Sequence, residues 1–389
     1  MKDIYIDGKP IGKGRYPFII AEAGVNHEGD PHLARALAEV GAWAGVDALK
    51  VQTFKADLIV TRNAEKAKYQ QENLGTSDSQ YEMLQKLELN DTQHRFLKSV
   101  CEEAGMTFLS TPHSGEWSVD YLTELGVPAF KIASPDLTNI PFIEYVARKG
   151  KPMILSTGMG TLDEVVEAVE AMRSQGNNQI VALHCTSNYP CPLDEVNLRA
   201  MHTIRDSLGI QVGYSDHTNG VAVPIMATAM GAVILEKHFT LDQKIRGNSP
   251  DHTSSLTPSQ LKEVVEAVRF TQKSGITDPA EALNAWYNHK GQQHFGVEHL
   301  ILPTLGTGTK EPTESELKIM HGLRKSTVAT REIKQGEILT TENTGIKRPM
   351  NGIKPKYYEE LITIPAQATR DIQEDEHITE ENCDFREEE

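Results

Sequence analysis

The chain has 389 residues, of which 39% are apolar, and its formal net charge is −16. This length suits more than one domain, or one barrel with an appendage. The acidity argues against general nucleic-acid binding, which needs clustered Lys and Arg to neutralise phosphates, so an anionic ligand requires a local cationic pocket.

The N-terminal segment and the cysteines indicate where the protein works. The first 18 residues contain no long apolar run, and the sequence shows no signal peptide or membrane span. The four cysteines are scattered without a CxxC pair, which argues against a zinc ribbon and is typical of a reduced compartment. We therefore expect a cytoplasmic protein that has no membrane partner.

Short apolar runs rich in β-branched residues recur along the first two-thirds of the chain. They lie at 17–26, 47–54, 107–112, 129–134, 152–158, 180–187, 211–217 and 232–239. The segments between them, such as LDEVVEAVEAMRSQG, have apolar residues at helical spacing. Eight strand–helix units in about 250 residues predict an α/β fold, a (β/α)₈ TIM barrel, over residues 1–272. A doubly wound sheet is the alternative, but no GxGxxG follows the first run.

The last third of the chain has a different pattern. Residues 273–315 carry several Gly and Pro without a clean period, and we predict a linker with an inserted element. Residues 316–389 contain short strand-like pieces such as STVATREI and EILTTENT, separated by turn signals such as KQGE and QEDE. This pattern predicts a small, mostly β domain.

Polar side chains follow every predicted strand, at the end of a barrel where active sites lie. The candidates are Glu22, Asn26, His27, Lys50, Gln52, Ser110, Thr111, Lys131, Ser134, Ser156, Thr157, Thr186, Ser187, Asn188, Tyr189, Ser215, Asp216, His217, Glu236, Lys237 and His238. The packed interior of a barrel prefers branched apolar side chains, so this set points to a ligand site rather than to packing.

The residue types indicate the chemistry. Lys50 and Lys131, together with several hydroxyls, predict an anion pocket, because an ammonium group is a point charge for phosphate and hydroxyls donate to its oxygens. His217 and His238 follow adjacent strands and can bind a divalent metal with positions left open for water or substrate. Glu22 is a candidate acid or base.

Each of these residues also has an ordinary structural explanation. A lysine at a strand end is usually solvated, and Ser156 or Ser215 can simply cap the next helix. We interpret four further histidines as structural or surface residues: His113, His184, His202 and His252. Cys185 and Cys191 are interpreted as packing residues, since nothing activates either thiol. The functional prediction therefore depends on the pattern over all eight strands.

Eight motifs resemble those of the sialic acid synthase family in order and spacing: IAEAGVNHEGD, LKVQTF, FLSTPHS, FKIAS, ILSTGM, HCTSNYP, YSDHT and EKHFT. The segment LRKSTVATREIKQGEILTTENTGIKRPMNGIKP resembles the family's antifreeze-like (SAF) domain. The resemblance implies a TIM barrel followed by that domain. It also implies a metal-dependent condensation of phosphoenolpyruvate with an N-acylated amino sugar, which releases phosphate by C–O cleavage and yields a nine-carbon 2-keto sugar acid.

The resemblance also implies roles for individual residues. Glu22 matches the family's catalytic carboxylate, and a Mn²⁺ or Mg²⁺ ion is implied on His217 and His238. Phosphoenolpyruvate binding is implied for Lys50, Thr111, Lys131, Ser134, Ser156, Ser187 and Ser215. Sugar contacts are implied for Gln52, Asp136, Tyr189, Asp251 and Arg348. Because the family forms homodimers with swapped C-terminal domains, we expect Arg348 to reach the barrel of the partner.

Several departures from the family pattern leave the acceptor sugar open. Pro135 and Asp136 stand where the family often has Gly-Glu, and Met350 follows Arg-Pro in place of Gly. The stretch RNAEKAKYQ…DSQYEMLQKLEL resembles bacillosamine-type and legionaminic acid synthases more than some sialic acid ones. The resemblance therefore implies N-acetylmannosamine or a related 6-deoxy diacetamido sugar as the acceptor, with legionaminic or pseudaminic acid synthesis in place of N-acetylneuraminate synthesis as the alternative.

Two other classes of function compete with this prediction. One is a barrel synthase that uses phosphoenolpyruvate with a different aldose. The other is a non-catalytic carbohydrate- or ice-binding protein, suggested by the antifreeze-like domain. Ice-binding faces are regular and uncharged, whereas this domain carries the cations Arg331, Lys334, Lys347, Arg348 and Lys354.

Overall fold

Eight parallel strands form the centre of the molecule in a computed structural model that describes residues 1–245, 247–291 and 298–385. They are β3 (Phe18–Gly24), β4 (Ala48–Thr53), β5 (Thr107–Pro112), β6 (Phe130–Ile132), β7 (Met153–Ser156), β8 (Ile180–His184), β9 (Gln211–Asp216) and β10 (Ile234–His238). Their order in the sheet is β5-β4-β3-β10-β9-β8-β7-β6, and β5 packs beside β6, which closes the barrel. Each predicted apolar run contains one of these strands, so the predicted TIM barrel is confirmed.

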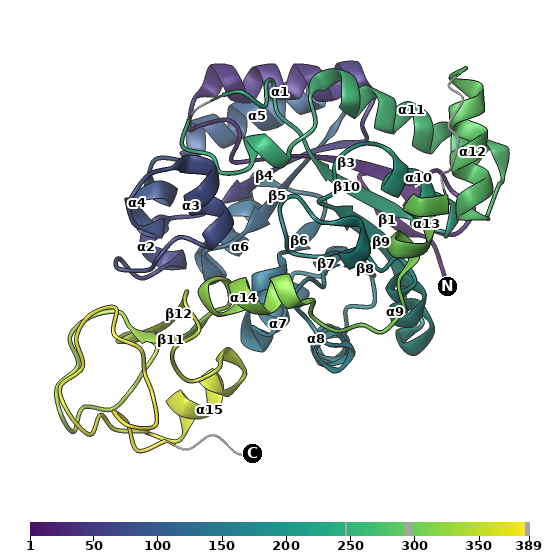
Figure 1. Cartoon of the computed structure of the whole chain (residues 1–389). Coiled ribbons are helices and arrows are strands. Elements are labelled where there is room, and N and C mark those ends of the chain that lie inside the picture. The colour runs from purple at the N-terminus through teal and green to yellow at the C-terminus, as the bar shows by residue number, and fades with distance from the viewer. Residues whose placement is uncertain (246, 292–297, 386–389) are drawn as a thin grey trace.

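Helices surround the barrel (Figure 1). They are α1 (Pro31–Ala44), α5 (Asp91–Glu103), α6 (Gly115–Leu125), α7 (Ile140–Ala147), α8 (Leu162–Ser174), α9 (Ala200–Leu208), α10 (Ala222–Ala229) and α11 (Pro258–Ser274). Helix α8 shows why these segments are helical: a capping box of Thr161 and Glu164 starts the helix, and Val165, Val169 and Met172 face the sheet. The outer apolar core lies between such helix faces and the strands.

An N-terminal hairpin covers the inner apolar cluster of the barrel. Strands β1 (Ile4–Ile6) and β2 (Lys9–Ile11) pair antiparallel, and Ile4, Ile6 and Ile11 pack with Phe18 and Ile20. These residues precede or begin the central strands, so the hairpin lies at the end of the barrel opposite the strand ends that carry the polar residues. The sequence pattern does not predict this element, because three-residue strands are too short to show a period.

The connection from β4 to α5 is a long excursion with three short helices. They are α2 (Ala56–Ile59), α3 (Lys68–Leu74) and α4 (Gln80–Gln85), and they form one group beside the barrel (Figure 1). A separate apolar cluster holds them there, with Val25, Phe54, Met83 and Leu87 among its members. The excursion thus joins the loop after β3 and brings side chains to the C-terminal ends of the strands.

Residues 273–315 contain more regular structure than the predicted linker. Helices α12 (Pro279–His289) and α13 (Glu298–Leu305) lie in it, and α14 (Glu314–Leu323) starts at its end. The small C-terminal unit follows, with β11 (Ser326–Ala329) paired antiparallel to β12 (Thr344–Lys347), several isolated β-bridges and helix α15 (Tyr358–Thr363). Its own apolar core includes Ile333, Leu339, Ile372 and Ile378. Among the described helices, none is long and apolar enough to cross a membrane.

Candidate active site

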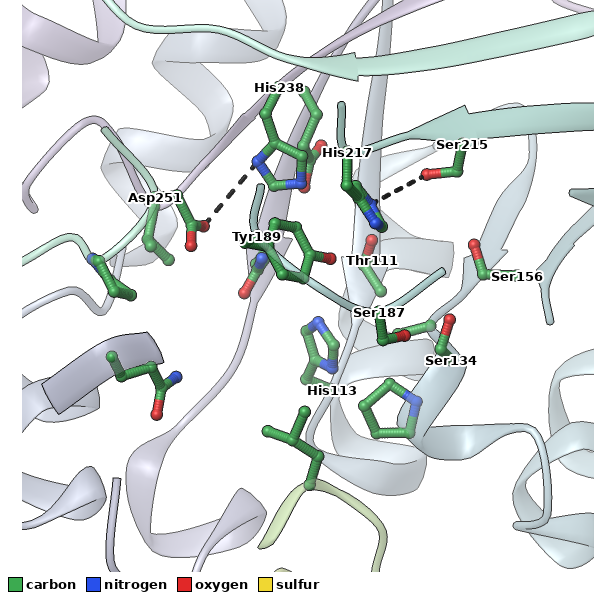
Figure 2. A pocket seen from close by; sticks show the side chains of 18 of the residues that line it. Thr111, His113, Ser134, Ser156, Ser187, Tyr189, Ser215, His217, His238 and Asp251 are labelled. Atoms are coloured by element: carbon green, nitrogen blue, oxygen red, sulfur yellow. Dashed lines mark hydrogen bonds and ion pairs between the residues drawn. The ribbon is translucent and has the colours of Figure 1, made fainter. Parts of the chain in front are cut away.

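A cavity lies at the C-terminal ends of the barrel strands and is closed on one side by the C-terminal unit. Fourteen of the fifteen predicted site residues line it: Glu22, Lys50, Gln52, Thr111, Lys131, Ser134, Ser156, Ser187, Tyr189, Ser215, His217, His238, Asp251 and Arg348. Figure 2 shows the two histidines over the middle of the cavity, Ser134, Ser156 and Ser187 on one side, and Asp251 on the other. The structure thus brings these side chains to one place, and the roles implied for them stay predictions.

Asp136, for which we expected a sugar contact, does not line the cavity. Its side chain is completely buried beside the cavity, and its Oδ1 forms an ion pair of 2.7 Å with Nζ of Lys325. His113, which we interpreted as structural, lies between Asp136 and the cavity: its Nδ1 is 3.9 Å from Asp136 Oδ2, and its side chain is part of the lining. Asp136 thus holds Lys325 in place, and His113 takes the position facing the cavity.

Two lysines and two glutamates form a buried charge cluster at the bottom of the cavity. Lys50 Nζ lies 2.8 Å from Glu22 Oε2 and 3.6 Å from Glu236 Oε2, and it donates to Thr111 Oγ1 at 3.0 Å. Lys131 Nζ lies 3.6 Å from Glu236 Oε1. All four side chains are nearly inaccessible to solvent. Charges of both signs that are buried this deeply are stable only when paired, so the cluster is a prearranged polar site.

The surroundings separate the pKa values of the two glutamates. Burial raises the pKa of Glu22 to about 7, although Lys50 opposes the shift. Burial also acts to raise the pKa of Glu236, but Lys131 and Lys50 hold it at about 2. Glu236 therefore stays ionised, whereas Glu22 can exist in either form near neutral pH. A carboxyl group with such a pKa is suited to take up or give a proton.

Glu236 lies at a predicted strand end, but only the structure shows what its carboxylate contacts. Its carboxylate accepts a hydrogen bond from Ser215 Oγ at 2.9 Å and lies between both lysines. It is the counter-charge that makes two buried ammonium groups possible in one cavity. A signal was available, because a Glu on a strand otherwise filled by apolar residues needs a cationic partner.

The histidine pair has the form that a metal ligand needs. Nδ1–H of His217 donates to the Thr186 carbonyl at 2.6 Å, so the lone pair is on Nε2, which lies 3.4 Å from Ser215 Oγ. Burial lowers the pKa of His217 to about 4 and that of His238 well below its usual value, so both rings are neutral. Nδ1 of His238 has no hydrogen-bond partner among the described residues and lies 3.9 Å from Asp251 Oδ2.

The two rings fit a metal site that is only partly made of protein. Their ring centroids are 5.7 Å apart, and the centroid of the Tyr189 ring lies 4.1 Å from that of His217 and 5.5 Å from that of His238. No cluster of three or more His, Cys, Asp or Glu able to hold a metal occurs in residues 1–245, 247–291 and 298–385. With two histidines as protein ligands, the remaining positions fall to water and substrate, which is the open arrangement that catalysis uses.

The opposite side of the cavity combines polar groups with an apolar wall. Gly24 has a φ of +53°, and a Cβ placed on it would lie 3.5 Å from Glu22 Oε1, 3.6 Å from Asp251 Oδ2 and 3.7 Å from Gln52 Nε2. Three polar side chains thus converge around Gly24, whose positive φ suits a residue without a Cβ. The lining also includes an apolar wall of Val25, Met83, Leu84 and Leu87, which belong to one apolar cluster, with Tyr69 and Gln70 from the same excursion.

The loop that carries Asp251 is fixed by the loop after β3. The Glu28 carboxylate accepts hydrogen bonds from the backbone N–H of Asn248 (2.5 Å) and Ser249 (2.9 Å) and from Nε2 of His252 (2.8 Å). His252 therefore has the structural role that the sequence suggested. Burial raises the pKa of Asp251 to about 6, so this carboxyl group is also able to exchange a proton.

The C-terminal unit completes the cavity of its own chain. The backbone of Arg348 pairs with the barrel excursion, since its N–H donates to Ile59 O at 2.9 Å and its carbonyl accepts from Thr61 N–H at 3.0 Å. The Arg348 side chain lines the cavity and is 7% exposed. The single chain thus makes by itself the contact that we expected across a dimer. A domain swap exchanges identical elements and would reproduce the same contact between two chains.

Comparison with known proteins gives consistent relatives. The NeuB family model matches residues 37–277, and the SAF domain model matches residues 324–382. The chain is similar to the N,N'-diacetyllegionaminic acid synthases of Campylobacter jejuni (41% identity over 93% of this chain and 98% of the relative) and Legionella pneumophila (39%, 91% and 91%). It also resembles the crystal structure of the spore coat polysaccharide biosynthesis protein SpsE from Bacillus subtilis, with a TM-score of 0.78, 31% identity and coverage of 99% and 100%.

Proposed function

The chain belongs to the NeuB family and carries a C-terminal SAF domain, and on this basis we propose that it condenses phosphoenolpyruvate with the aldehyde of an N-acylated amino sugar. The products are phosphate and a nine-carbon 2-keto sugar acid. The observation that carries the proposal is the buried cluster of Lys50, Lys131 and Glu236 beside Glu22, whose pKa is about 7.

The lysine side of the cavity supports binding of phosphoenolpyruvate. Lys131 Nζ donates to Ser156 Oγ at 2.5 Å, and the hydroxyls of Ser134 and Ser187 lie on the same side (Figure 2). An ammonium group surrounded by hydroxyls holds a phosphate as a point charge with several donors. Lys50 and Thr111 extend the same donor set toward Glu22, which suits the second anionic group of the substrate.

The apolar wall supports a 6-deoxy diacetamido sugar as the acceptor in preference to N-acetylmannosamine. Val25, Met83, Leu84 and Leu87 can bury a methyl group of a deoxy carbon or an acetamido group, and a hydroxymethyl group would lose hydrogen bonds to water there. The similar Campylobacter and Legionella proteins are named as N,N'-diacetyllegionaminic acid synthases. The proposed acceptor follows from these two observations together.

In the reaction, C3 of phosphoenolpyruvate attacks the aldehyde carbon, water adds to C2, and phosphate leaves with cleavage of the C–O bond. A Mn²⁺ or Mg²⁺ ion on His217 and His238 would supply Lewis-acid polarisation of the aldehyde oxygen. Glu22, in its ionised form, takes one proton from the water that adds to C2. This proton ends on the former aldehyde oxygen, and the second proton of the water leaves with the phosphate when the C2 carbonyl forms. Lys131 and the neighbouring hydroxyls hold the phosphate so that the two carbon centres meet in one orientation.

Arg348 and the C-terminal unit act as a cover over the reactants. A closed cavity keeps bulk water from the cationic centre that develops at C2, so only the water bound in the site reacts. We propose that the active form is a homodimer in which the C-terminal units are exchanged. The exchange gives each cavity the Arg348 contact that the single chain makes with itself.

The experiment that tests this function measures phosphate release from phosphoenolpyruvate against a panel of acceptors. The panel contains a 6-deoxy diacetamido sugar, N-acetylmannosamine and unsubstituted pentose or hexose phosphates, each with Mn²⁺ present. We expect release that depends on the acceptor, with the highest kcat/KM for the diacetamido sugar. A preference for a sugar phosphate would overturn the proposed acceptor class, and no release with any acceptor would overturn the proposed reaction.

A further inference from the structure

Helix α14 places a buried carboxylate over the mouth of the barrel. The Glu316 side chain is 1% exposed, although its neighbour Leu317 on the same helix is 59% exposed. Its Oε1 accepts two hydrogen bonds, from the backbone N–H of Met159 and from that of Ser187, both at 2.7 Å. Its Oε2 accepts from Thr313 N–H at 3.0 Å and caps the helix. One side chain therefore joins the loops after β7 and β8 to the helix.

The loop after β8 carries the Ser187 hydroxyl of the proposed phosphate pocket, and the loop after β7 contacts the Ser134 hydroxyl, which follows β6. Ser187 lines the cavity, and Gly158 N–H donates to Ser134 Oγ at 3.1 Å. A Cβ on Gly158 would lie 2.3 Å from Ser187 Oγ and 2.7 Å from Ser134 Oγ, so the loop backbone presses directly against both hydroxyls. A small movement of residues 158–159 would change the spacing of these donors.

The backbone after β7 is held in a conformation that it would not adopt unaided. Met159 has a φ of +60°, in the left-handed region that costs energy for any residue with a Cβ. Its N–H is bound by Glu316, and its carbonyl accepts from Nη2 of Arg324 at 2.9 Å. Arg324 is itself paired with Glu164 at 2.7 Å, so both peptide groups of Met159 are fixed by residues 316–324.

Helix capping alone does not account for the Glu316 carboxylate. The cap uses Oε2, whereas Oε1 serves the two barrel loops. Burying a carboxylate close to a pocket for an anion is costly unless hydrogen bonds compensate for it, and here all three bonds come from backbone N–H groups. The arrangement thus uses those N–H groups to fix the loops and does not offer them to the ligand.

We propose that Glu316, which lies on helix α14, is a positioning residue for phosphoenolpyruvate. It sets the distance between the Ser134 and Ser187 hydroxyls by holding the loops after β7 and β8. The inference rests on the proposed function and extends it beyond the residues that touch the substrate. The phosphate pocket is then complete only when α14 is docked on the mouth of the barrel. The affinity for phosphoenolpyruvate then depends on the segment that leads to the C-terminal unit.

The test compares Glu316→Gln with Glu314→Gln, the same change at an exposed position of the same helix. Glutamine has no charge to share between two N–H groups. We expect Glu316→Gln to raise KM for phosphoenolpyruvate about tenfold, equivalent to about 1.4 kcal/mol of lost binding, with the KM for the amino sugar unchanged. Titration calorimetry of phosphoenolpyruvate alone should show the same loss, and Glu314→Gln should match the unmodified protein in both measurements.

Glu316→Asp keeps the charge and shortens the side chain. It replaces the glutamine variant in the test if that variant does not fold. The aspartate cannot reach both loops and the helix cap together, so its KM for phosphoenolpyruvate should rise as well. A lower melting temperature or a lower kcat with an unchanged KM and an unchanged calorimetric Kd would overturn the inference, because it would show a purely structural role. If the unmodified protein neither turns over nor binds phosphoenolpyruvate, the proposed function itself is wrong.

Discussion

Replacing Lys131 by Met tests the phosphate side of the site while keeping the aliphatic part of the side chain. In the structure the Lys131 ammonium lies 2.5 Å from Ser156 Oγ and 3.6 Å from Glu236 Oε1, and the side chain is 4% exposed. A hydrogen bond to a charged group in such a place contributes about 1.5–3 kcal/mol. Its loss should raise the KM for phosphoenolpyruvate roughly 10- to 150-fold. The KM for the amino sugar should change little, because Lys131 lies on the phosphate side.

Lys237→Met is the matched control for this variant. Lys237 is also a buried lysine at a strand end and is paired with a carboxylate, Asp216, at 2.5 Å, but it does not line the cavity. Removing one partner of a buried pair costs about 3–5 kcal/mol. Lys131→Met should lower the free energy of unfolding by less than Lys237→Met does, because Glu236 keeps Lys50 as a partner. Steady-state kinetics with each substrate varied, together with urea unfolding, measures both effects. An unchanged KM for phosphoenolpyruvate in Lys131→Met would refute the assignment of Lys131 to the substrate.

Three further predictions concern the metal, the dimer and the pH dependence of stability. Chelation should abolish activity and Mn²⁺ should restore it, whereas His217→Ala and His238→Ala should stay inactive with Mn²⁺; full activity after exhaustive chelation would contradict this. Glu22→Ala and Arg348→Ala should regain activity when reassembled together if the units are exchanged, and mixed dimers without activity would show that each chain covers its own barrel. Burial lowers the pKa of His184 from 6.5 to about 3. The neutral ring therefore contributes its full share to the free energy of unfolding above pH 6.5, and this share is lost as the pH falls toward 3. His184→Gln should remove about 3 kcal/mol of the loss in unfolding free energy between pH 7 and pH 4; equal losses in both proteins would contradict the burial of a neutral ring.

The barrel was predictable because its strands are buried on both faces. Each strand shows as a continuous apolar run, as in IVALHCTS, and a polar end follows it. The N-terminal hairpin and the short helices α2, α3 and α4 were not predicted, because elements of three to seven residues do not complete enough periods to be recognised. The helices between 279 and 323 were missed for a related reason, since several Gly and Pro interrupt the pattern there.

The site was predictable where it depends on the strands themselves. Residues at the ends of parallel strands meet at the same end of the barrel, so Glu22, Lys50 and Lys131 could be placed together without coordinates. Contacts made by distant segments could not be foreseen. Glu316 reaches Ser187 across 129 positions of sequence, and Lys325 pairs with Asp136 from beyond the linker. No local spacing reports such contacts, because they depend on where the chain returns after the barrel is complete.

The most direct test of the account follows the bridging oxygen of phosphoenolpyruvate. The protein is incubated with a 6-deoxy diacetamido sugar and phosphoenolpyruvate that carries ¹⁸O between C2 and phosphorus, and the released phosphate is analysed by mass spectrometry. Attack of water at C2, with the proton taken by Glu22, predicts that the label leaves with phosphate and that a nine-carbon 2-keto acid forms. Unlabelled phosphate would show cleavage of the P–O bond and would contradict the proposed reaction.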